Sequence, residues 1–255
     1  MKKSREEINA TERAYWNEKK LDRTKIKPLR RHAFFYSYKR EAKLIRELII
    51  RETEGKKVLE LGSYVWSTWI KENAVPQKLT CINISEAELQ KGIDHTHDIV
   101  FDTEFLLMDA NELAFDDASF DVVIGGAILH HLDIEKTLSH VYRVLKPNGV
   151  IIFLEPLNMN PLYKVYRKLN PQERTPDEHA LVSSDFKIIK KSFTFDHYFM
   201  DFFTVIFGFI SLKIFGDKKY DNWLNRLGFN LDLLFSKIPF LHVLFARVIV
   251  YGRKK

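Results

Sequence analysis

Residues 108–156 read MDANELAFDDASFDVVIGGAILHHLDIEKTLSHVYRVLKPNGVIIFLEP, a stretch in which polar turns alternate with apolar runs. Asp109 stands at the end of one expected strand, and a second apolar strand begins with Phe120–Ile124. A Leu-His-His turn (Leu129–His131) leads into a helix that we expect to end at Lys146–Gly149, where another strand begins at once. In a parallel sheet this order places polar side chains at the carboxyl ends of adjacent strands, where open α/β sheets bind ligands.

The same alternation of strands and helices extends on both sides of this stretch. Short apolar runs predict strands over residues 57–61, 79–84, 105–108, 122–125, 150–154, 192–199 and 245–253. Helical spacing predicts a charged helix before Pro28 and a second helix over Arg31–Arg51, and Ser85 is expected to cap a helix over Glu86–Lys91, with Glu88 completing a capping box. Together these elements predict a doubly wound, seven-stranded and mostly parallel α/β sheet.

Several spaced elements within residues 56–156 resemble class I S-adenosylmethionine (SAM)-dependent methyltransferases, most closely those that act on small molecules. The elements are Asp109-Ala110 after the third strand, Ser119-Phe120-Asp121 before the fourth, and Leu145-Lys146-Pro147-Asn148-Gly149 before the fifth. The resemblance implies a Rossmann-like methyltransferase fold, SAM as the cofactor, and transfer of its methyl group to a small-molecule acceptor.

The resemblance also identifies the start of a cofactor loop after the first strand. It implies that Glu60 organises hydrogen bonds at the amino group of SAM, and that Gly62 and Ser63 bring backbone close to its methionyl portion. Tyr64 and Trp66 stand where further glycines are usual. Either their rings pack over the cofactor from a rebuilt loop, or they pack at a helix start and the site has lost SAM.

Asn83 occupies the position at which the resemblance implies an acidic residue for the ribose hydroxyls, 21 residues after Gly62. An amide oxygen can accept one hydroxyl hydrogen bond but carries no charge, so a weaker contact is expected. Ile84 would then flank the adenine with an apolar surface.

Asp109 and Ala110 resemble the pair that recognises adenine, through a carboxylate at the exocyclic amine and a backbone N–H at a ring nitrogen. Asp109 could instead serve only as the N-cap of a following turn. Gly125 and Gly126 end the fourth strand, where small residues would let the cofactor lie against the backbone, and a simple strand-end turn explains them equally well.

His130 and His131 follow the fourth strand and are the candidate catalytic residues, because an imidazole can accept a hydroxyl proton near neutral pH. The alternative is that this turn only forms local hydrogen bonds. Aromatic residues of the N-terminal helices could close over the cofactor, or could be ordinary core; they are Tyr15, Trp16, Phe35 and Tyr36.

Other site types find little support in the sequence. His95, His97 and Asp98 lack a fuller ligand pattern and are expected in a solvated loop, so no metal site is predicted. The motif Asn/Asp-Pro-Pro-aromatic of base methyltransferases is missing, so no nucleic-acid partner is expected.

The 255 residues suffice for one core with appendages. We divide them into an N-terminal helical cap (1–55), a SAM-binding core (56–200), an apolar helical insertion or lid (201–244) and a final core strand (245–255). Cys81 is the only cysteine, which excludes an internal disulfide, and the N-terminus lacks the apolar region of a signal peptide, so a cytoplasmic protein is expected.

Charge and hydropathy point to an amphiphilic partner. Residues 1–57 carry a net charge of +9 and residues 196–255 a net charge of +4, whereas residues 58–195 carry −7. Residues 202–212 (FFTVIFGFISL) are apolar on all sides, which suits either a lid or a membrane interface. We therefore expect an acceptor that is amphiphilic, such as a lipid-linked or glycosidic molecule, and peripheral contact with the inner membrane surface; the alternative is a catalytically inactive scaffold or membrane-associated interaction protein.

Overall fold

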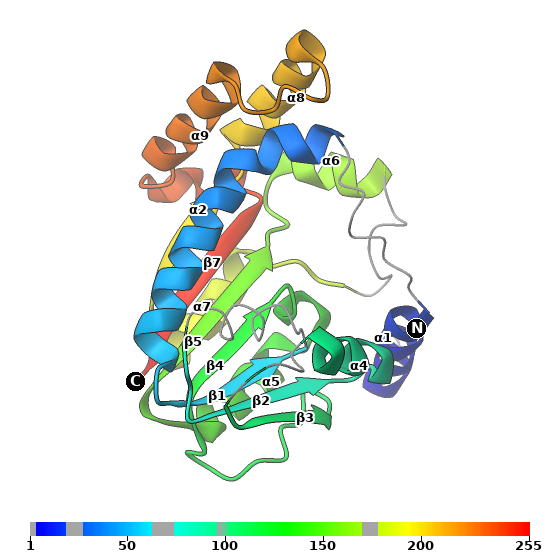
Figure 1. Cartoon of the computed structure of the whole chain (residues 1–255), viewed down its shortest axis with the longest axis vertical. Coiled ribbons are helices and arrows are strands. Elements are labelled where there is room, and N and C mark those ends of the chain that lie inside the picture. Colours follow the sequence, from blue (N-terminus) through cyan, green and yellow to red (C-terminus); the bar gives the residue numbers. More distant parts are fainter. Residues whose placement is uncertain (1–3, 19–27, 63–73, 96–98, 100, 170–177) are drawn as a thin grey trace.

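A seven-stranded sheet runs through the centre of the computed structural model, with helices on both faces (Figure 1). The structure describes residues 4–18, 28–62, 74–95, 99, 101–169 and 178–255. The strands are β1 (Lys57–Leu61), β2 (Lys78–Asn83), β3 (Thr103–Leu107), β4 (Phe120–Gly126), β5 (Leu145–Pro156), β6 (Phe193–Met200) and β7 (Arg247–Lys254). Their order is β3-β2-β1-β4-β5-β7-β6, and β7 pairs antiparallel with both β5 and β6, while the other pairs are parallel. The predicted fold class is confirmed.

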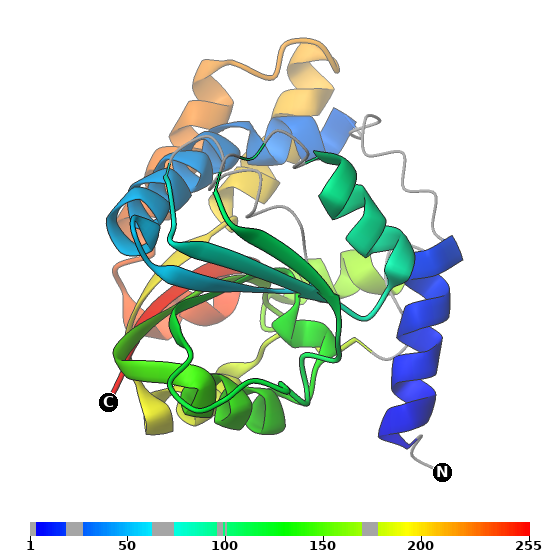
Figure 2. The same ribbon diagram turned by 60° about the horizontal axis from the view of Figure 1, so that its bottom comes forward.

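The helices are distributed over the two faces and the edges of the sheet. They are α1 (Arg5–Glu18), α2 (Pro28–Thr53), α4 (Glu86–His95), α5 (Ile134–Val144), α6 (Pro161–Leu169), α7 (Ser183–Ser192), α8 (Phe203–Phe215) and α9 (Trp223–Phe235), with short 3₁₀ segments η1 (Leu129–His131) and η3 (Pro239–Leu244). One face packs against α5 and α7 through Leu138, Val141 and Ile189, and the other against α2 through Ile45 and Ile49. In both ribbon views α1 lies beside α4, and α8 and α9 lie beside α2 (Figure 2).

The strand order reverses between β1 and β4, and this reversal opens a crevice. The chain leaves β1 toward β2 on one side and leaves β4 toward β5 on the other. The loops that follow their carboxyl ends therefore diverge, and such a switch point is where doubly wound sheets bind ligands.

The observed elements differ from the predicted ones mainly at their ends. Pro28 does not merely break the first helix but begins α2, a position that its fixed φ and missing N–H suit. The helix after the Leu-His-His turn ends at Val144 instead of within Lys146–Gly149, because Pro147 cannot continue a helix and residues 145–156 already form β5. The connector expected over 156–184 contains α6 and the start of α7.

The apolar segment predicted over 201–244 forms α8, α9 and η3, between β6 and β7. In the part of the chain that the structure describes, none of the helices combines the length and the apolar character needed to cross a bilayer.

Candidate functional site

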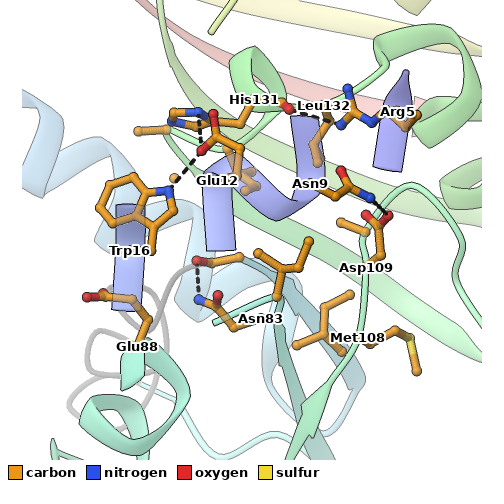
Figure 3. A pocket seen from close by; sticks show the side chains of 17 residues that line it. Arg5, Asn9, Glu12, Trp16, Asn83, Glu88, Met108, Asp109, His131 and Leu132 are labelled. Carbon is orange, nitrogen blue, oxygen red and sulfur yellow. Dashed lines mark hydrogen bonds and ion pairs between the residues drawn. The ribbon is translucent and has the colours of Figure 1, made fainter. Parts of the chain in front are cut away.

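A cavity of about 290 Å³ lies at the carboxyl ends of β1, β2 and β4, next to the turn that follows β3 (Figure 3). Four side chains of α1 line one wall, and residues that follow the four strands line the rest. Its described lining consists of Arg5, Asn9, Glu12, Trp16, Gly62, Ile82, Asn83, Ile84, Glu88, Met108, Asp109, Ala110, Gly126, Ala127, Ile128, His131 and Leu132. The volume is close to the lower end of the range for small-molecule pockets.

Gly62 ends β1 at the floor of this cavity. Its φ of +70° lies in the left-handed region, and a Cβ there would come within 2.2 Å of Ile128 Cδ1. Gly125 is constrained by packing alone, since its Cβ would meet Ile128 Cγ2 at 2.6 Å and Phe153 Cε1 at 2.9 Å. Glycine is thus required at both positions by the protein's own packing, whatever ligand the cavity holds.

Asn83 ends β2 and joins two turns of the backbone. Its Nδ2 donates to the Gly62 carbonyl oxygen at 2.6 Å, and its Oδ1 accepts from the Ser85 N–H at 2.9 Å. Ser85 Oγ accepts from the Glu88 N–H at 3.2 Å, which confirms the predicted cap of α4. The other half of the expected capping box is wrong: the Ser85 N–H goes to Asn83 and not to the Glu88 carboxylate.

Asp109 forms a local turn and also lines the cavity. Its Oδ1 accepts from the backbone N–H and the side-chain amide of Asn111, at 2.8 and 2.7 Å, in a local turn. Its Oδ2 points toward α1 and accepts from Asn9 Nδ2 at 2.6 Å. Asp109 lines the cavity beside Ala110, so a turn-forming carboxylate also faces the space available for a ligand.

Helix α1 closes the cavity from above with Arg5, Asn9, Glu12 and Trp16, which share one face of the helix (Figure 3). Arg5 donates to the backbone oxygen of His131 at 3.0 Å, and Glu12 accepts from Trp16 Nε1 at 3.0 Å and lies 3.2 Å from His131 Nδ1. Of these four residues only Trp16 was predicted; the i, i+4, i+7, i+11 spacing was the signal available. Phe35 and Tyr36 pack away from the cavity, against Tyr220 and Phe229.

The two predicted catalytic histidines differ in their surroundings. His131 lines the cavity, whereas His130 is buried beneath the turn, with Nδ1 2.9 Å from Glu155 Oε2. Glu155 Oε1 accepts from the backbone N–H groups of Ile128 and Leu129, so one carboxylate fixes the whole turn. Complete burial raises the pKa of the Glu155 carboxyl to about 7, although the hydrogen bonds from Leu129 and Ile128 act to lower it.

Among the residues that the structure describes, one group of side chains could hold a metal ion. His130, His131 and Glu178 each offer a nitrogen or oxygen within 4.8 Å of the others, and His130 Nε2 lies 3.8 Å from Glu178. Each histidine also has its Nδ1 beside a carboxylate, Glu155 or Glu12. The sequence did not suggest this group, because Glu178 is distant in the chain. His97 and Asp98 lie outside the described residues, as does the His95 side chain.

The predicted cofactor residues separate into three groups. Those that line the cavity are Gly62, Asn83, Ile84, Asp109, Ala110 and Gly126. Glu60 and Gly125 are described but are not part of the lining; the fully buried Glu60 accepts a hydrogen bond from Cys81 Sγ at 3.4 Å. Ser63 and the aromatic residues Tyr64 and Trp66 lie outside the described residues.

Comparisons with known proteins agree on the domain that surrounds this cavity. Residues 60–153 match the family described as "Methyltransferase domain". A ubiquinone/menaquinone biosynthesis C-methyltransferase, UbiE, of Idiomarina loihiensis is 36% identical over 92 residues, which cover 33% of this chain and 37% of the relative. The chain therefore matches well under two thirds of that relative's length.

Solved structures resemble the chain over much more of its length. A geranyl diphosphate C-methyltransferase from Streptomyces coelicolor A3(2) has a TM-score of 0.64 at 10% identity, covering 97% of this chain and 98% of its own. The [4+2]-cyclase SpnF has a TM-score of 0.54 at 16% identity, covering 84% of this chain and 80% of its own. At such low identity these similarities show a shared fold, and the two reactions differ.

Proposed function

Because the chain contains a methyltransferase domain of class I fold, we propose that it transfers the methyl group of SAM to a small, amphiphilic acceptor. The observation that carries this proposal is the cavity at the β1/β4 switch point, whose lining includes Gly62, Asn83, Asp109 and Gly126. These are positions that the resemblance implies for the cofactor, and they come together from four separate strands.

The charge of the cavity suits a cationic ligand. Its described lining includes the carboxylates of Glu12, Glu88 and Asp109 and one guanidinium, that of Arg5. SAM, when bound, supplies a sulfonium whose methyl group is electrophilic. Three carboxylates in a partly desolvated cavity favour such a cation over a neutral or anionic molecule of similar shape.

In this proposal the chain's own residues bind, orient and exclude water. When SAM is bound, the Gly62 backbone would approach its methionyl portion, Asp109 would accept from the adenine amine, and the Ala110 N–H would donate to the ring. Helix α1 covers the cavity and excludes water, which strengthens each polar contact beneath it.

The two histidines have separate tasks in the proposed reaction. His131 faces the cavity and can accept a proton from the acceptor, with Glu12 at its Nδ1 to hold the ring and stabilise the imidazolium. His130 is a positioning residue, because it and the backbone of the turn are fixed by Glu155.

The amphiphilic acceptor is supported by the outer surface of α8, α9 and η3. These elements expose large apolar side chains: Phe209, Ile210, Ile214, Trp223, Leu227, Leu234, Phe240 and Val243. Exposed cations lie among them in the chain, namely Lys213, Lys218, Lys219, Arg226 and Lys237, against Asp217 and Asp221. Apolar side chains flanked by cations match the chemistry of an anionic phospholipid surface. UbiE and the geranyl diphosphate enzyme are named for prenyl-type or quinone substrates, which agrees with an acceptor of this kind.

Calorimetry with SAM and S-adenosylhomocysteine tests the cofactor assignment. We expect micromolar binding of both, and Asp109→Ala should weaken it by about 10- to 100-fold because a charged hydrogen bond is lost. Asp116→Ala, at an exposed position, is the matched control and should bind as the wild type does. No binding of either ligand at millimolar concentration would favour the alternative of an inactive scaffold.

Release of S-adenosylhomocysteine tests transfer itself, with prenylated quinols and prenyl diphosphates as acceptors. His131→Ala should abolish release while leaving SAM binding within a few-fold of the wild type, whereas release that persists would remove His131 from the reaction.

Vesicle co-sedimentation tests whether the outer surface of α8, α9 and η3 binds a membrane. The protein should pellet with vesicles of phosphatidylcholine and phosphatidylglycerol more than with phosphatidylcholine alone, and the double variant Ile214→Asp/Trp223→Asp should stay in solution. Val75→Asp, at a residue that is 54% exposed elsewhere on the molecule, is the control. Equal pelleting of the double variant and the wild type would refute membrane contact through α8 and α9.

A further inference from the structure

Asn83, the residue expected to bind the ribose of the cofactor, already forms hydrogen bonds that stabilise the fold. Both ends of the Asn83 amide bind backbone, Nδ2 to the Gly62 oxygen at 2.6 Å and Oδ1 to the Ser85 N–H at 2.9 Å. An aspartate at this position would place a carboxylate oxygen, which cannot donate, next to the Gly62 carbonyl oxygen. The turn therefore needs the N–H donor of an amide. Asn83 therefore joins the turns after β1 and β2, and it offers a ribose no negative charge.

A carboxylate stands close by, on the first turn of α4. Glu88 lines the same cavity and is 6% exposed, and its side chain lies on the cavity side of α4, below Trp16 (Figure 3). At this helix position a glutamate ordinarily accepts the N-cap N–H. Here Asn83 accepts that N–H, so the Glu88 carboxylate is not required for the cap.

A cation and a helix terminus lie beside the Glu88 carboxylate. Lys91 forms an ion pair with Oε1, and the amino-terminal turn of α4 favours negative charge. A carboxylate can accept about four hydrogen bonds through its two oxygens, so it can bind a ligand hydroxyl together with protein donors.

We infer that Glu88 is the residue that accepts the hydrogen bonds of the ribose diol, in place of the strand-end residue Asn83. This inference rests on the proposed function. Asn83 accepts the Ser85 N–H, which Glu88 would accept in an ordinary capping box. Glu88 would in turn supply the carboxylate that Asn83 does not have. Two neighbouring hydroxyl donors match the two oxygens of a carboxylate.

The competing explanation is that Glu88 only stabilises the start of α4, through the helix dipole and Lys91. A structural role of this kind would affect every ligand alike, and it would not depend on whether the ligand carries its 2′- and 3′-hydroxyls. The hydroxyl groups of the ligand therefore separate the two explanations.

The test is calorimetry with S-adenosylhomocysteine and its 2′-deoxy and 3′-deoxy analogues, on the full chain. The wild type should bind the parent compound about 10- to 100-fold more tightly than either analogue. Glu88→Gln should weaken the parent compound more than either analogue, because each analogue has only one hydroxyl contact to lose, so the preference for the parent compound should shrink.

Two further variants serve as controls. Glu86→Gln removes the same charge from the same helix turn at an exposed position, and it should keep the preference. Asn83→Ala should lower the melting temperature and weaken all three ligands, again with the preference kept.

A preference that is undiminished in a folded Glu88→Gln variant, or that shrinks only in Asn83→Ala, would overturn the inference and leave the proposed function standing. A wild type that binds S-adenosylhomocysteine without preferring the hydroxyls would also overturn it. If the wild type binds none of the three compounds, the proposed function itself fails.

Discussion

The central sheet and the α8–α9 pair bury opposite kinds of residue. The sheet buries mainly apolar side chains, with Val58, Leu59 and Ile124 fully inaccessible. Helix α8 instead turns Thr204, Gly208 and Ser211 inward, and α9 turns Asn225, Gly228 and Asp232 inward. The large apolar residues of the pair, such as Ile214 and Trp223, are 63% and 66% exposed.

Different forces therefore hold the two regions together. The sheet gains its stability from apolar surface removed from water. The pair relies on close approach of small residues and on hydrogen bonds: His32 of α2 contacts Ser211 Oγ at 2.9 Å and the Gly216 oxygen at 3.0 Å, and Asp232 accepts from the Phe203 N–H at 2.7 Å. Helices packed within a bilayer use the same small and polar contacts, with apolar residues outside, and this agrees with the membrane contact proposed above.

The largest expected effect on the free energy of unfolding comes from a residue between the sheet and the helices α2, α8 and α9. Arg247 of β7 forms ion pairs with Asp201 and with Glu41 of α2, and all three are largely buried. Arg247→Met should lower the free energy of unfolding by about 3–5 kcal/mol, because two buried carboxylates lose their counter-charge. Denaturant unfolding measures this, with Arg253→Met as the control.

Arg253 also pairs with a carboxylate, that of Glu52, but its side chain is 48% exposed. Its removal should cost less than about 1 kcal/mol. Equal losses in the two variants would show that the junction is hydrated, and that the regions are not joined through a buried charge.

Truncation of two isoleucines compares the regions directly. Ile249→Ala removes a fully buried side chain of β7 and should cost about 2–5 kcal/mol, whereas Ile214→Ala removes one that is 63% exposed and should cost less than about 0.5 kcal/mol. The same unfolding experiment measures both. A large loss in Ile214→Ala would mean that the outer surface of α8 is covered in solution, by a second copy of the chain for example.

The strands of the sheet could be predicted from the sequence because each one is specified by residues that are close together in the chain. Each strand is an apolar run bounded by turn residues, and Asp109 and Asn83 follow their strands directly. The resemblance over residues 56–156 then implied the methyltransferase fold, whereas the strand order was not predicted, because apolar runs alone leave it open.

The remaining features depend on contacts between distant residues. The polar face of α1 resembles any solvated helix until His131 and Asp109 are placed opposite it. The roles of Asn83 and Glu88 depend on which acceptor reaches the Ser85 N–H, and either residue could have done so from its spacing alone. The sequence of residues 202–212 is apolar on all sides of a helix. That its few polar residues point inward becomes visible only when α2 is placed against them.

The buried carboxyl of Asp232 on α9 should make the free energy of unfolding depend on pH. Burial, together with Asp201, raises the pKa of Asp232 to about 6 from an ordinary value of 3.8, while hydrogen bonds from Phe203 and Thr204 act to lower it. The folded state therefore holds this proton more tightly than the unfolded state does, so the contribution of Asp232 is full below pH 4 and is lost as the pH rises to 6.

The corresponding loss of stability between pH 4 and pH 6 is up to about 3 kcal/mol in the wild type. Asp232→Asn cannot titrate at this position and should not show the loss, so the difference in unfolding free energy between the two proteins should change by that amount. Denaturant unfolding at both values provides the numbers. Parallel pH profiles for the two proteins would mean that Asp232 is ionised and hydrated.

The smallest effect, and the one whose sign is most informative, concerns Gly208. In an exposed helix Gly→Ala stabilises by about 1 kcal/mol. Here a Cβ would come within 2.5 Å of Ala33 Cα and 2.7 Å of its nitrogen, so α8 and α2 must separate, and we expect Gly208→Ala to destabilise by about 1–2 kcal/mol. Asn230→Ala, at an exposed position of α9, should be neutral or stabilising in the same thermal unfolding measurement. If Gly208→Ala stabilises as well, α8 does not rest on the backbone of α2, and close packing of small residues is not what holds this region together.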